Sequence, residues 1–302
     1  MAARLHRQQP SRQYQPRRSG CDENDGKNVH MRKPIVRSLL KGVAFITGAA
    51  SGIGKATAYS LARHGITKLA ITDINLAAAE KTASTLKSDL GGHIHVLPLK
   101  LDVTNEQAVA ETVSTIVKEF GRIDVAVNNA GIGGPAVPSA DHPYEEWKKT
   151  LDIDLNGVWL TSREEIRQML KQEPLVPNSP RHPRGTIINI ASMYGIVATN
   201  LNTPVVSYTA AKHGVVGLTK ADAVAYASRG IKINALCPGY VLTPLMQEHM
   251  KGETMQKELE KTPMGRMATM EEMGDHVVML ASPLGSFMCG AALVADGGFT
   301  IQ

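Results

Sequence analysis

The sequence predicts an α/β protein with one doubly wound parallel sheet of about seven strands and helices on both of its faces. Short apolar runs, typical of strands buried in a parallel sheet, recur along the chain. Segments of helical character separate these runs, and several begin at a capping residue and end at a glycine. The first apolar run leads directly into a glycine-rich turn and then into a helix.

Strands and helices alternate throughout the chain beyond its first 40 residues, which favours a single domain over residues 41–302. Asn75 is expected to cap the second helix, and Thr104 with Gln107 resembles a capping box at the start of the third. The strands are expected at residues 43–46, 68–73, 95–102, 123–127, 186–190, 231–236 and 291–295. The helices are expected at residues 55–64, 75–90, 104–120, 144–170, 208–229 and 270–281.

Residues 1–40 form a basic N-terminal extension, and the first 30 of them are expected to be disordered. Residues 1–41 hold ten of the 33 Lys and Arg residues and three of the 28 acids, so the body of the chain is close to neutral. A neutral body argues against nucleic-acid binding. Two alternatives for the extension are a mitochondrial presequence, because residues 1–21 contain arginine but no acid, and a translation start at Met31.

The three cysteines, Cys21, Cys237 and Cys289, are odd in number and lack the spacing of a metal site. They are expected to be free thiols in a reducing compartment, which favours a cytoplasmic location without a bound metal. No apolar run reaches the length of a membrane span.

The glycine-rich turn has the spacing G-x-x-x-G-x-G, with glycines at Gly48, Gly52 and Gly54. A strand, a glycine turn and a helix bring free backbone N–H groups and the positive end of the helix to one point, where a pyrophosphate can bind. The alternative is a strand–turn–helix connection that binds nothing.

Asp73 lies nineteen residues beyond Gly54, at the end of the second expected strand. A carboxylate there can accept hydrogen bonds from both hydroxyls of an adenosine ribose. It would also repel a 2′-phosphate, which favours NAD over NADP. The alternative is an acidic residue that only closes the turn after the strand.

Tyr208 and Lys212 are four residues apart, with Ser192 a short way upstream. On a helix this spacing places the two side chains on one face. An ammonium close to a phenol lowers the phenol pKa, which gives a general acid/base that works near neutral pH. A surface pair without a function is the alternative.

Together these residues resemble the short-chain dehydrogenase/reductase family, whose fold is a single Rossmann-type sheet. The similarity runs from about Lys41 to Gln302. The matching motifs, in the family's order, are Thr47 to Gly54, Asp73, Leu101-Asp102-Val103, Asn128 to Gly131, Ser192, Tyr208 with Lys212, Pro238-Gly239 and Asp296-Gly297-Gly298.

The resemblance implies a role for each matching residue. Tyr208 would be the acid/base, Lys212 would lower its pKa and hold the nicotinamide ribose, and Ser192 would orient the substrate oxygen. Cofactor contacts are implied at Gly48, Ser51, Gly52, Ile53, Gly54, Asp73, Asp102, Val103, Asn129, Ala130, Gly131, Tyr208, Lys212, Val241 and Thr243.

Three features depart from the family pattern. Ser192 and Tyr208 are sixteen residues apart, which is longer than usual, so a loop at residues 201–206 is expected beside the substrate. Residues 171–185, with four prolines, look like a surface insertion. Counting from Gly157, Asp154 holds the position of the family's catalytic asparagine.

In the family, that asparagine braces a break in its helix and belongs to the proton path from the lysine to solvent. Asp154 is expected to take its place. The alternative is that Asp154 only caps or solvates a helix turn. Asn156, two residues on, is turned by about 200° on a helix and is expected to face the other way.

The resemblance implies an oxidoreductase that transfers a hydride between NAD(H) and a small or medium secondary alcohol or ketone. Residues 243–263 would form a loop over the substrate. A homodimer or homotetramer is expected, since the outer faces of helices 144–170 and 208–229 pair across a two-fold axis in the family. Two alternatives stay open: an NAD(H)-binding sensor or scaffold without turnover, and a non-redox isomerase or lyase that uses the same Tyr–Lys pair.

Overall fold

The computed structural model describes residues 38–199, 204–244, 246 and 253–302. The expectations for residues 1–37, including disorder, a presequence and a start at Met31, lie outside the described residues. Ser38–Gln302 form one compact unit.

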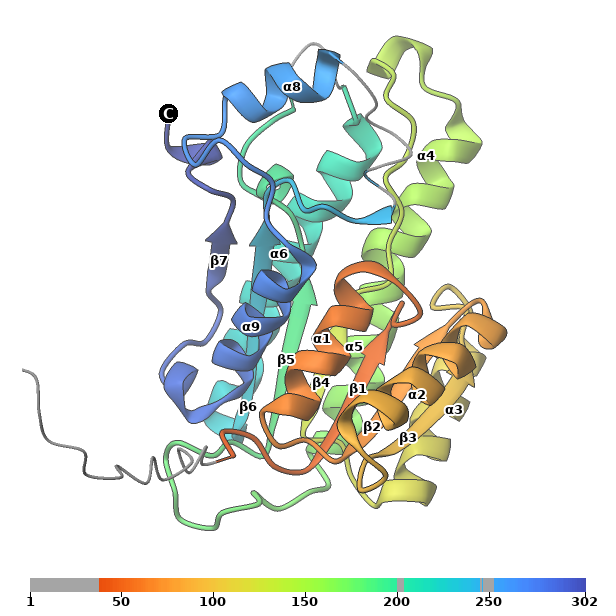
Figure 1. Cartoon of the computed structure of the whole chain (residues 1–302), viewed down its shortest axis with the longest axis vertical. Coiled ribbons are helices and arrows are strands. Elements are labelled where there is room, and N and C mark those ends of the chain that lie inside the picture. The colour runs from red at the N-terminus through yellow and green to blue at the C-terminus, as the bar shows by residue number, and fades with distance from the viewer. Residues whose placement is uncertain (1–37, 200–203, 245, 247–252) are drawn as a thin grey trace, which may run out of the picture. The chain divides into compact units, whose positions relative to one another are not determined.

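Seven parallel strands form one sheet in the order β3-β2-β1-β4-β5-β6-β7, as Figure 1 shows, and the predicted fold class is confirmed. Each strand pairs with its neighbour in parallel register; Phe45 in β1, for example, lies opposite Ala70 in β2 and Ala126 in β4. The strands are β1 Val43–Thr47, β2 Lys68–Asp73, β3 His95–Lys100, β4 Val125–Asn128, β5 Gly185–Ile190, β6 Ile231–Pro238 and β7 Ala292–Ala295.

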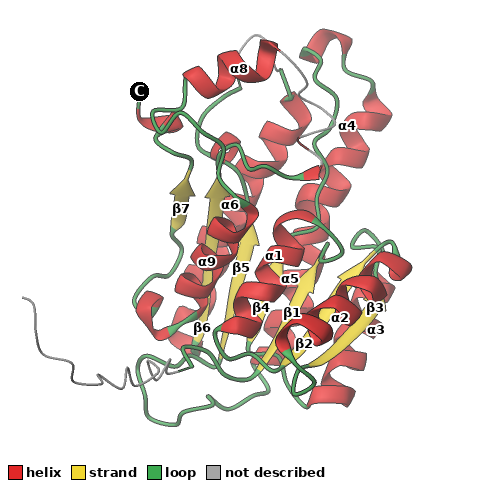
Figure 2. Ribbon diagram, in the orientation of Figure 1, coloured by secondary structure: helices red, strands yellow, loops and turns green. Residues whose placement is uncertain are grey.

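Helices cover both faces of the sheet (Figure 2). Successive strand residues point to opposite faces, so Ile46 packs in the core with α1, α2 and α9, and Phe45 packs with α3 and α5 on the other side. The helices are α1 Gly52–Arg63, α2 Leu76–Leu90, α3 Glu106–Phe120, α4 Tyr144–Leu151, α5 Gly157–Met169, α6 Val206–Tyr226, α8 Glu253–Glu260 and α9 Met270–Ala281. Short 3₁₀ turns include η3 Met193–Gly195, η5 Pro283–Gly285 and η6 Phe299–Ile301.

The single helix expected at 144–170 is instead interrupted by a π-helical segment, η2, at Asp152–Asn156. A π-helical turn holds one more residue than an α-helical turn, so it displaces the side chains within it. The break places Asp154 in the interior, where it is fully buried.

The capping box expected at Thr104 and Gln107 is wrong. Asn105 is the N-cap of α3, and its side-chain oxygen accepts the N–H of Ala108 at 2.9 Å. The Thr104 hydroxyl donates to Asp102 instead, at 2.7 Å. Asn75 caps α2 as predicted, accepting the N–H of Ala78 at 3.1 Å.

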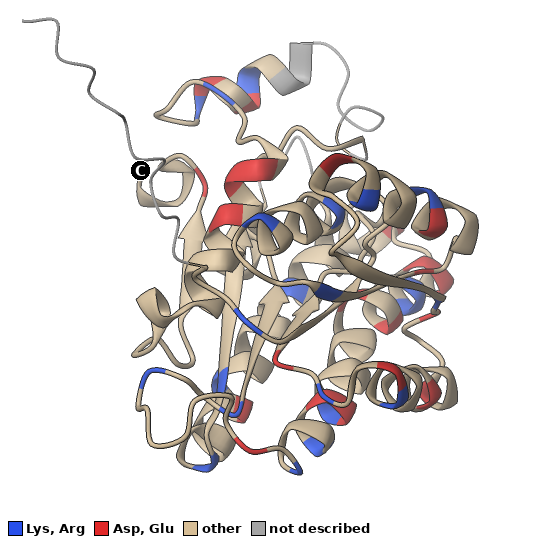
Figure 3. Cartoon of the chain, turned by 60° about the horizontal axis from the view of Figure 1, so that its bottom comes forward, with Lys and Arg blue, Asp and Glu red and all other residues tan. Residues whose placement is uncertain are grey.

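Figure 3 shows acidic and basic residues interspersed over the helices. Cys237 is buried in β6 and Cys289 is exposed, and both are free thiols. Within the described ranges, no helix is long and apolar enough to cross a membrane.

Candidate active site

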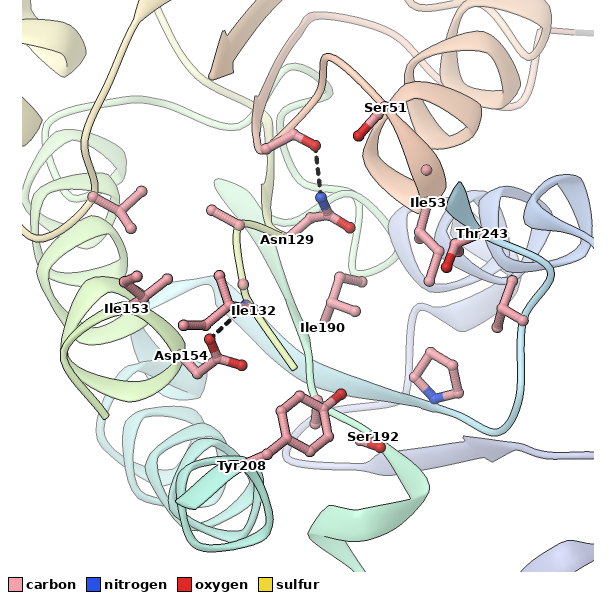
Figure 4. A pocket seen from close by; sticks show the side chains of 18 of the residues that line it. Ser51, Ile53, Asn129, Ile132, Ile153, Asp154, Ile190, Ser192, Tyr208 and Thr243 are labelled. Carbon is pink, nitrogen blue, oxygen red and sulfur yellow. Dashed lines mark hydrogen bonds between the residues drawn. The ribbon is translucent and has the colours of Figure 1, made fainter. Parts of the chain in front are cut away.

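The carboxyl ends of the strands border a cavity of about 510 Å³ (Figure 4). Parallel strands commonly form ligand sites at this edge. The residues predicted from the sequence that line it are Gly48, Ser51, Gly52, Ile53, Asp73, Asp102, Val103, Asn129, Ala130, Gly131, Asp154, Ser192, Tyr208, Lys212, Val241 and Thr243.

Gly54 is the one predicted residue that does not line the cavity. A Cβ at Gly54 would lie 2.3 Å from the carbonyl oxygen of Gly48, so this glycine lets α1 pack directly under the turn. Gly48 and Gly52 have φ values of +62° and +55°, which favour glycine. Ser51 is the N-cap of α1 and makes no side-chain capping bond, which leaves the first N–H groups of α1 available to an anion.

The loop after β4 braces the glycine turn. The Asn129 side-chain amide donates to the carbonyls of Thr47 and Gly48, at 3.0 and 2.9 Å. The Thr47 hydroxyl in turn accepts the N–H groups of Asn129 and Ala130, at 3.0 and 3.1 Å. These four bonds fix the glycine turn to the loop that follows the neighbouring strand β4.

Asp73 stands at the end of β2 beside the glycine turn. Its carboxylate accepts the N–H groups of Ala50 and Asn75, at 3.1 and 3.0 Å. The Asp102 carboxylate, one strand further out, is bound to the backbone and hydroxyl of Thr104. Ile74, which the sequence did not single out, is 64% exposed and also lines the cavity.

Ser192, Tyr208 and Lys212 meet on the other side of the cavity. Ser192 follows β5, and its hydroxyl oxygen accepts the N–H of Tyr194 at 3.2 Å. Tyr208 and Lys212 are one turn apart on α6, with the Lys212 ammonium 5.3 Å from the centre of the Tyr208 ring. The ammonium donates to the carbonyl of Ile190 at 3.2 Å.

The pKa of Tyr208 is raised by burial, which outweighs the lowering effects of the Lys212 charge and a side-chain hydrogen bond with Ser192. The charge of Asp154 raises this pKa further. The expected effect of Lys212 is therefore present, but the pKa does not fall below its ordinary value. The sequence gives no direct measure of burial, which is why its prediction had the wrong sign.

Asp154 joins the Tyr–Lys pair from the π-helical segment. One carboxylate oxygen accepts the N–H of Ile132 at 2.8 Å, and the other lies 3.2 Å from the Lys212 ammonium. Burial raises the pKa of Asp154, while Lys212 and the Ile132 amide oppose this shift. Asn156 is exposed and donates to Asp152 at 2.9 Å, so it faces away, as predicted.

Apolar residues also line the cavity. The sequence singled out neither the isoleucines among them nor Met246, although each follows or precedes a recognised motif. They are Ile132, Ile153, Ile190, Pro238, Pro244 and Met246. Part of the expected substrate loop, residues 245 and 247–252, lies outside the described residues.

A glycine turn under a helix N-terminus, an acid at the end of β2 and a buried Tyr–Lys pair all face one cavity, an arrangement typical of dinucleotide-binding proteins of the doubly wound class. A family model described as enoyl-(acyl carrier protein) reductase matches residues 48–300.

Two curated relatives act on cyclic alcohols, according to their names. The cis-4-hydroxycyclohexanecarboxylate dehydrogenase of Sinomonas cyclohexanicum is 38% identical over 263 residues, covering 87% of this chain and 98% of the relative. The cyclohexanol dehydrogenase of an Acinetobacter strain is 36% identical over 270 residues, covering 89% and 99%.

The structure of a 3-ketoacyl-(acyl-carrier-protein) reductase from Brucella melitensis, complexed with NADH, has a TM-score of 0.73 to this chain. The two are 29% identical, and the match covers 86% of this chain and 98% of the other. The chain belongs to the short-chain dehydrogenase/reductase family.

Proposed function

We propose that this chain transfers a hydride between NAD(H) and a secondary alcohol or ketone, using Ser192, Tyr208 and Lys212. One observation carries the proposal: these three side chains line the same cavity as the glycine turn and Asp73. The reacting groups therefore lie across one space from the residues suited to hold a dinucleotide.

The residues on the nucleotide side fit a dinucleotide cofactor. The open N–H groups at the start of α1 suit a pyrophosphate, and Gly52 keeps side-chain atoms away from it. In the proposed arrangement, Asp102, Val103 and Ile74 would contact the adenine. The ribose and nicotinamide would be held by other residues of the cavity lining, namely Asn129, Ala130, Gly131, Val241 and Thr243. The nicotinamide supplies or accepts the hydride when it is bound.

NAD(H) is the proposed cofactor rather than NADP(H). The Asp73 carboxylate would accept the ribose hydroxyls and repel a 2′-phosphate. Among the described residues that line the cavity, the one cation is Lys212, at the opposite end from Asp73. No arginine or lysine of this lining is placed to neutralise the extra phosphate.

In the proposed mechanism, Ser192 hydrogen-bonds the substrate oxygen and Tyr208 gives or takes its proton. Lys212 favours the phenolate form of Tyr208 through its charge. Asp154 holds the Lys212 ammonium and takes the place of the family's asparagine in the path of the proton to solvent.

The proposed substrate is a small or medium, partly apolar molecule, with a ring alcohol or ketone as the first choice. Isoleucine, proline and methionine side chains line the same cavity as Ser192 and Tyr208. Two relatives are named for cyclohexane alcohols, which supports the same class.

Purified protein is mixed with NAD⁺ or NADP⁺ and a panel of cyclic and open-chain secondary alcohols, with NADH absorbance as the readout. Turnover with NAD⁺ that disappears in Tyr208→Phe supports the proposal. NADH binding without turnover across alcohols and ketones would instead indicate a sensor, and substrate conversion without a change in NADH would indicate an isomerase or lyase.

A further inference from the structure

We propose that Glu258 is a positioning residue for the substrate side of the site. Its carboxylate binds helix α8 to Tyr240, which contacts Tyr194. Tyr194 lies in the turn directly after Ser192, so Glu258 is connected to that turn through the two tyrosines. The inference rests on the proposed function, because substrate binding is one of its readouts. Glu258 itself does not line the described cavity.

Glu258 is a fully buried acid near the end of α8. It is 0% exposed, whereas Glu260, two residues later on α8, is exposed. A buried carboxylate is costly unless charged or polar partners satisfy it. One oxygen of Glu258 accepts the Tyr240 hydroxyl at 3.0 Å, and the other lies 2.7 Å from the ammonium of Lys261.

The hydrogen bonds continue from Glu258 into the site. The Tyr240 and Tyr194 hydroxyls are 2.8 Å apart. Tyr194 belongs to η3, the turn directly after Ser192, and its N–H donates to the Ser192 hydroxyl oxygen. A chain of three side chains therefore connects α8 to a residue that holds the substrate oxygen in the proposed mechanism.

Aromatic packing holds the two tyrosines in place. The ring of Phe299 meets Tyr194 and Tyr240 edge to face, with centroid distances of 6.5 and 5.7 Å. Tyr208 and Met246, which both line the cavity, pack against the same apolar cluster. The tyrosine pair thus lies behind the wall of the cavity, between α8 and the reacting groups.

The segment after α8 is fixed independently. The N–H of Met264 donates to the carbonyl of Gly297 at 3.1 Å, and a Cβ at Gly297 would lie 2.8 Å from Thr262. With this end of the helix held by the residues after β7, Glu258 fixes how α8 lies over the strand ends, where Figure 1 places it. Loss of the Glu258 bond should loosen α8 and the tyrosine pair without unfolding the sheet.

The test compares Glu258→Ala, Glu258→Gln and the matched surface control Glu260→Ala, with cyclohexanol and NAD⁺ as substrates. Glu258→Ala should raise the KM for cyclohexanol about tenfold, because hydrogen bonds to a charged group are lost. NADH affinity, measured by fluorescence, should stay within about twofold. Glu258→Gln keeps an acceptor for Tyr240 and should recover most of the loss, and Glu260→Ala should behave as the parent protein.

Hydrogen–deuterium exchange gives a second readout that needs no turnover. Peptides covering residues 256–262 should exchange faster in Glu258→Ala than in Glu260→Ala. If the parent protein oxidises no alcohol, the proposed function fails, and the role of Glu258 is then judged by hydrogen–deuterium exchange alone. The role of Glu258 is refuted if Glu258→Ala is folded and both its exchange and its KM are unchanged. Should Glu258→Ala not fold, Tyr240→Phe removes the same hydrogen bond, and a parental KM and exchange in that variant overturn it equally.

Discussion

Tyr208 is the residue whose loss should be most damaging to activity. Tyr208→Phe removes the hydroxyl that gives or takes the proton in the proposed mechanism, and kcat/KM should fall by about 10²–10⁴-fold. NADH affinity should change by less than about threefold, because the ring remains. Steady-state kinetics and fluorescence titration measure the two effects. A variant that keeps a tenth or more of the parental activity would show that another group transfers the proton.

Asp73 should determine the choice between NAD⁺ and NADP⁺. Asp73→Asn removes the negative charge but keeps the shape of the side chain and one acceptor oxygen for the backbone N–H groups. The ratio of kcat/KM for NAD⁺ to that for NADP⁺ should fall on the order of tenfold, because repulsion of the 2′-phosphate is lost. Equal or better use of NADP⁺ by the parent protein would refute the assignment.

Asp154 should influence the pH dependence of the reaction. Its charge raises the pKa of Tyr208, so Asp154→Asn should lower that pKa. Alcohol oxidation needs the phenolate, and its acidic limb should therefore move to lower pH while kcat is kept or raised. Asp154→Leu, which cannot hold Lys212, should lower kcat, and Asn156→Ala should leave it unchanged. The pH profiles of kcat, with melting temperatures as controls, decide this.

If Asn156→Ala is folded but inactive while Asp154→Leu is fully active, the family's catalytic asparagine corresponds to Asn156 and not to Asp154.

At the scale of single residues, motif spacing predicted which side chains would share the cavity. It placed Asp154 on the inner side of its helix and Asn156 on the outer side. It could not predict the contact between Asp154 and Lys212, because that contact depends on how α6 packs against the π-helical segment. The sign of the Tyr208 pKa shift was missed for a similar reason, since burial is a property of the folded chain.

At the scale of elements, the stability of α9 should depend on its capping box. The Thr269 hydroxyl accepts the N–H of Glu272 at 3.1 Å, and the Glu272 carboxylate accepts the N–H of Thr269 at 2.7 Å. Thr269→Ala should cost about 1 kcal/mol and lower Tm by about 2–4 °C. Thr115→Ala, at an exposed position inside α3, is the control and should leave Tm nearly unchanged. Calorimetry that finds equal Tm values for both variants would contradict this.

Element boundaries were predicted less well than the elements themselves. β6 continues to Pro238 because Pro238 lies opposite Ala295 in β7, a partner far along the chain. At α3, the Thr104 hydroxyl is bound to Asp102, and the next residue, Asn105, caps the helix instead. In both cases, the boundary of the element was set by a contact with a residue outside that element.

At the scale of the whole molecule, we predict a homodimer or homotetramer. Trp159 on α5 and Val224 on α6 are 45% and 85% exposed, and both helices belong to the region expected to pair. Burying such apolar side chains against a second copy would be favourable. Val224→Glu should shift the protein towards smaller species in light scattering at micromolar concentration, with a nearly unchanged monomer fold. A parent protein that is monomeric under these conditions would refute the prediction.

The fold as a whole was the most predictable feature, because seven apolar runs alternating with helices admit few topologies other than a doubly wound sheet. Residues 201–203 of the loop expected at 201–206, and residues 245 and 247–252 of the expected substrate loop, lie outside the described residues. The described part of the substrate loop contains the helix α8, which the sequence did not predict.

The position of β7 has a consequence for protein synthesis. β7 pairs with β6 at the edge of the sheet, and Phe299, shortly after it, supports Tyr194 and Tyr240. The ribosome makes strands β1 to β4 first and these residues near the end of translation. A nascent chain can therefore bury most of its sheet before Phe299 packs against Tyr194 and Tyr240. Messenger RNAs cut short before the codon for residue 292 should yield polypeptides that lack both β7 and this aromatic contact.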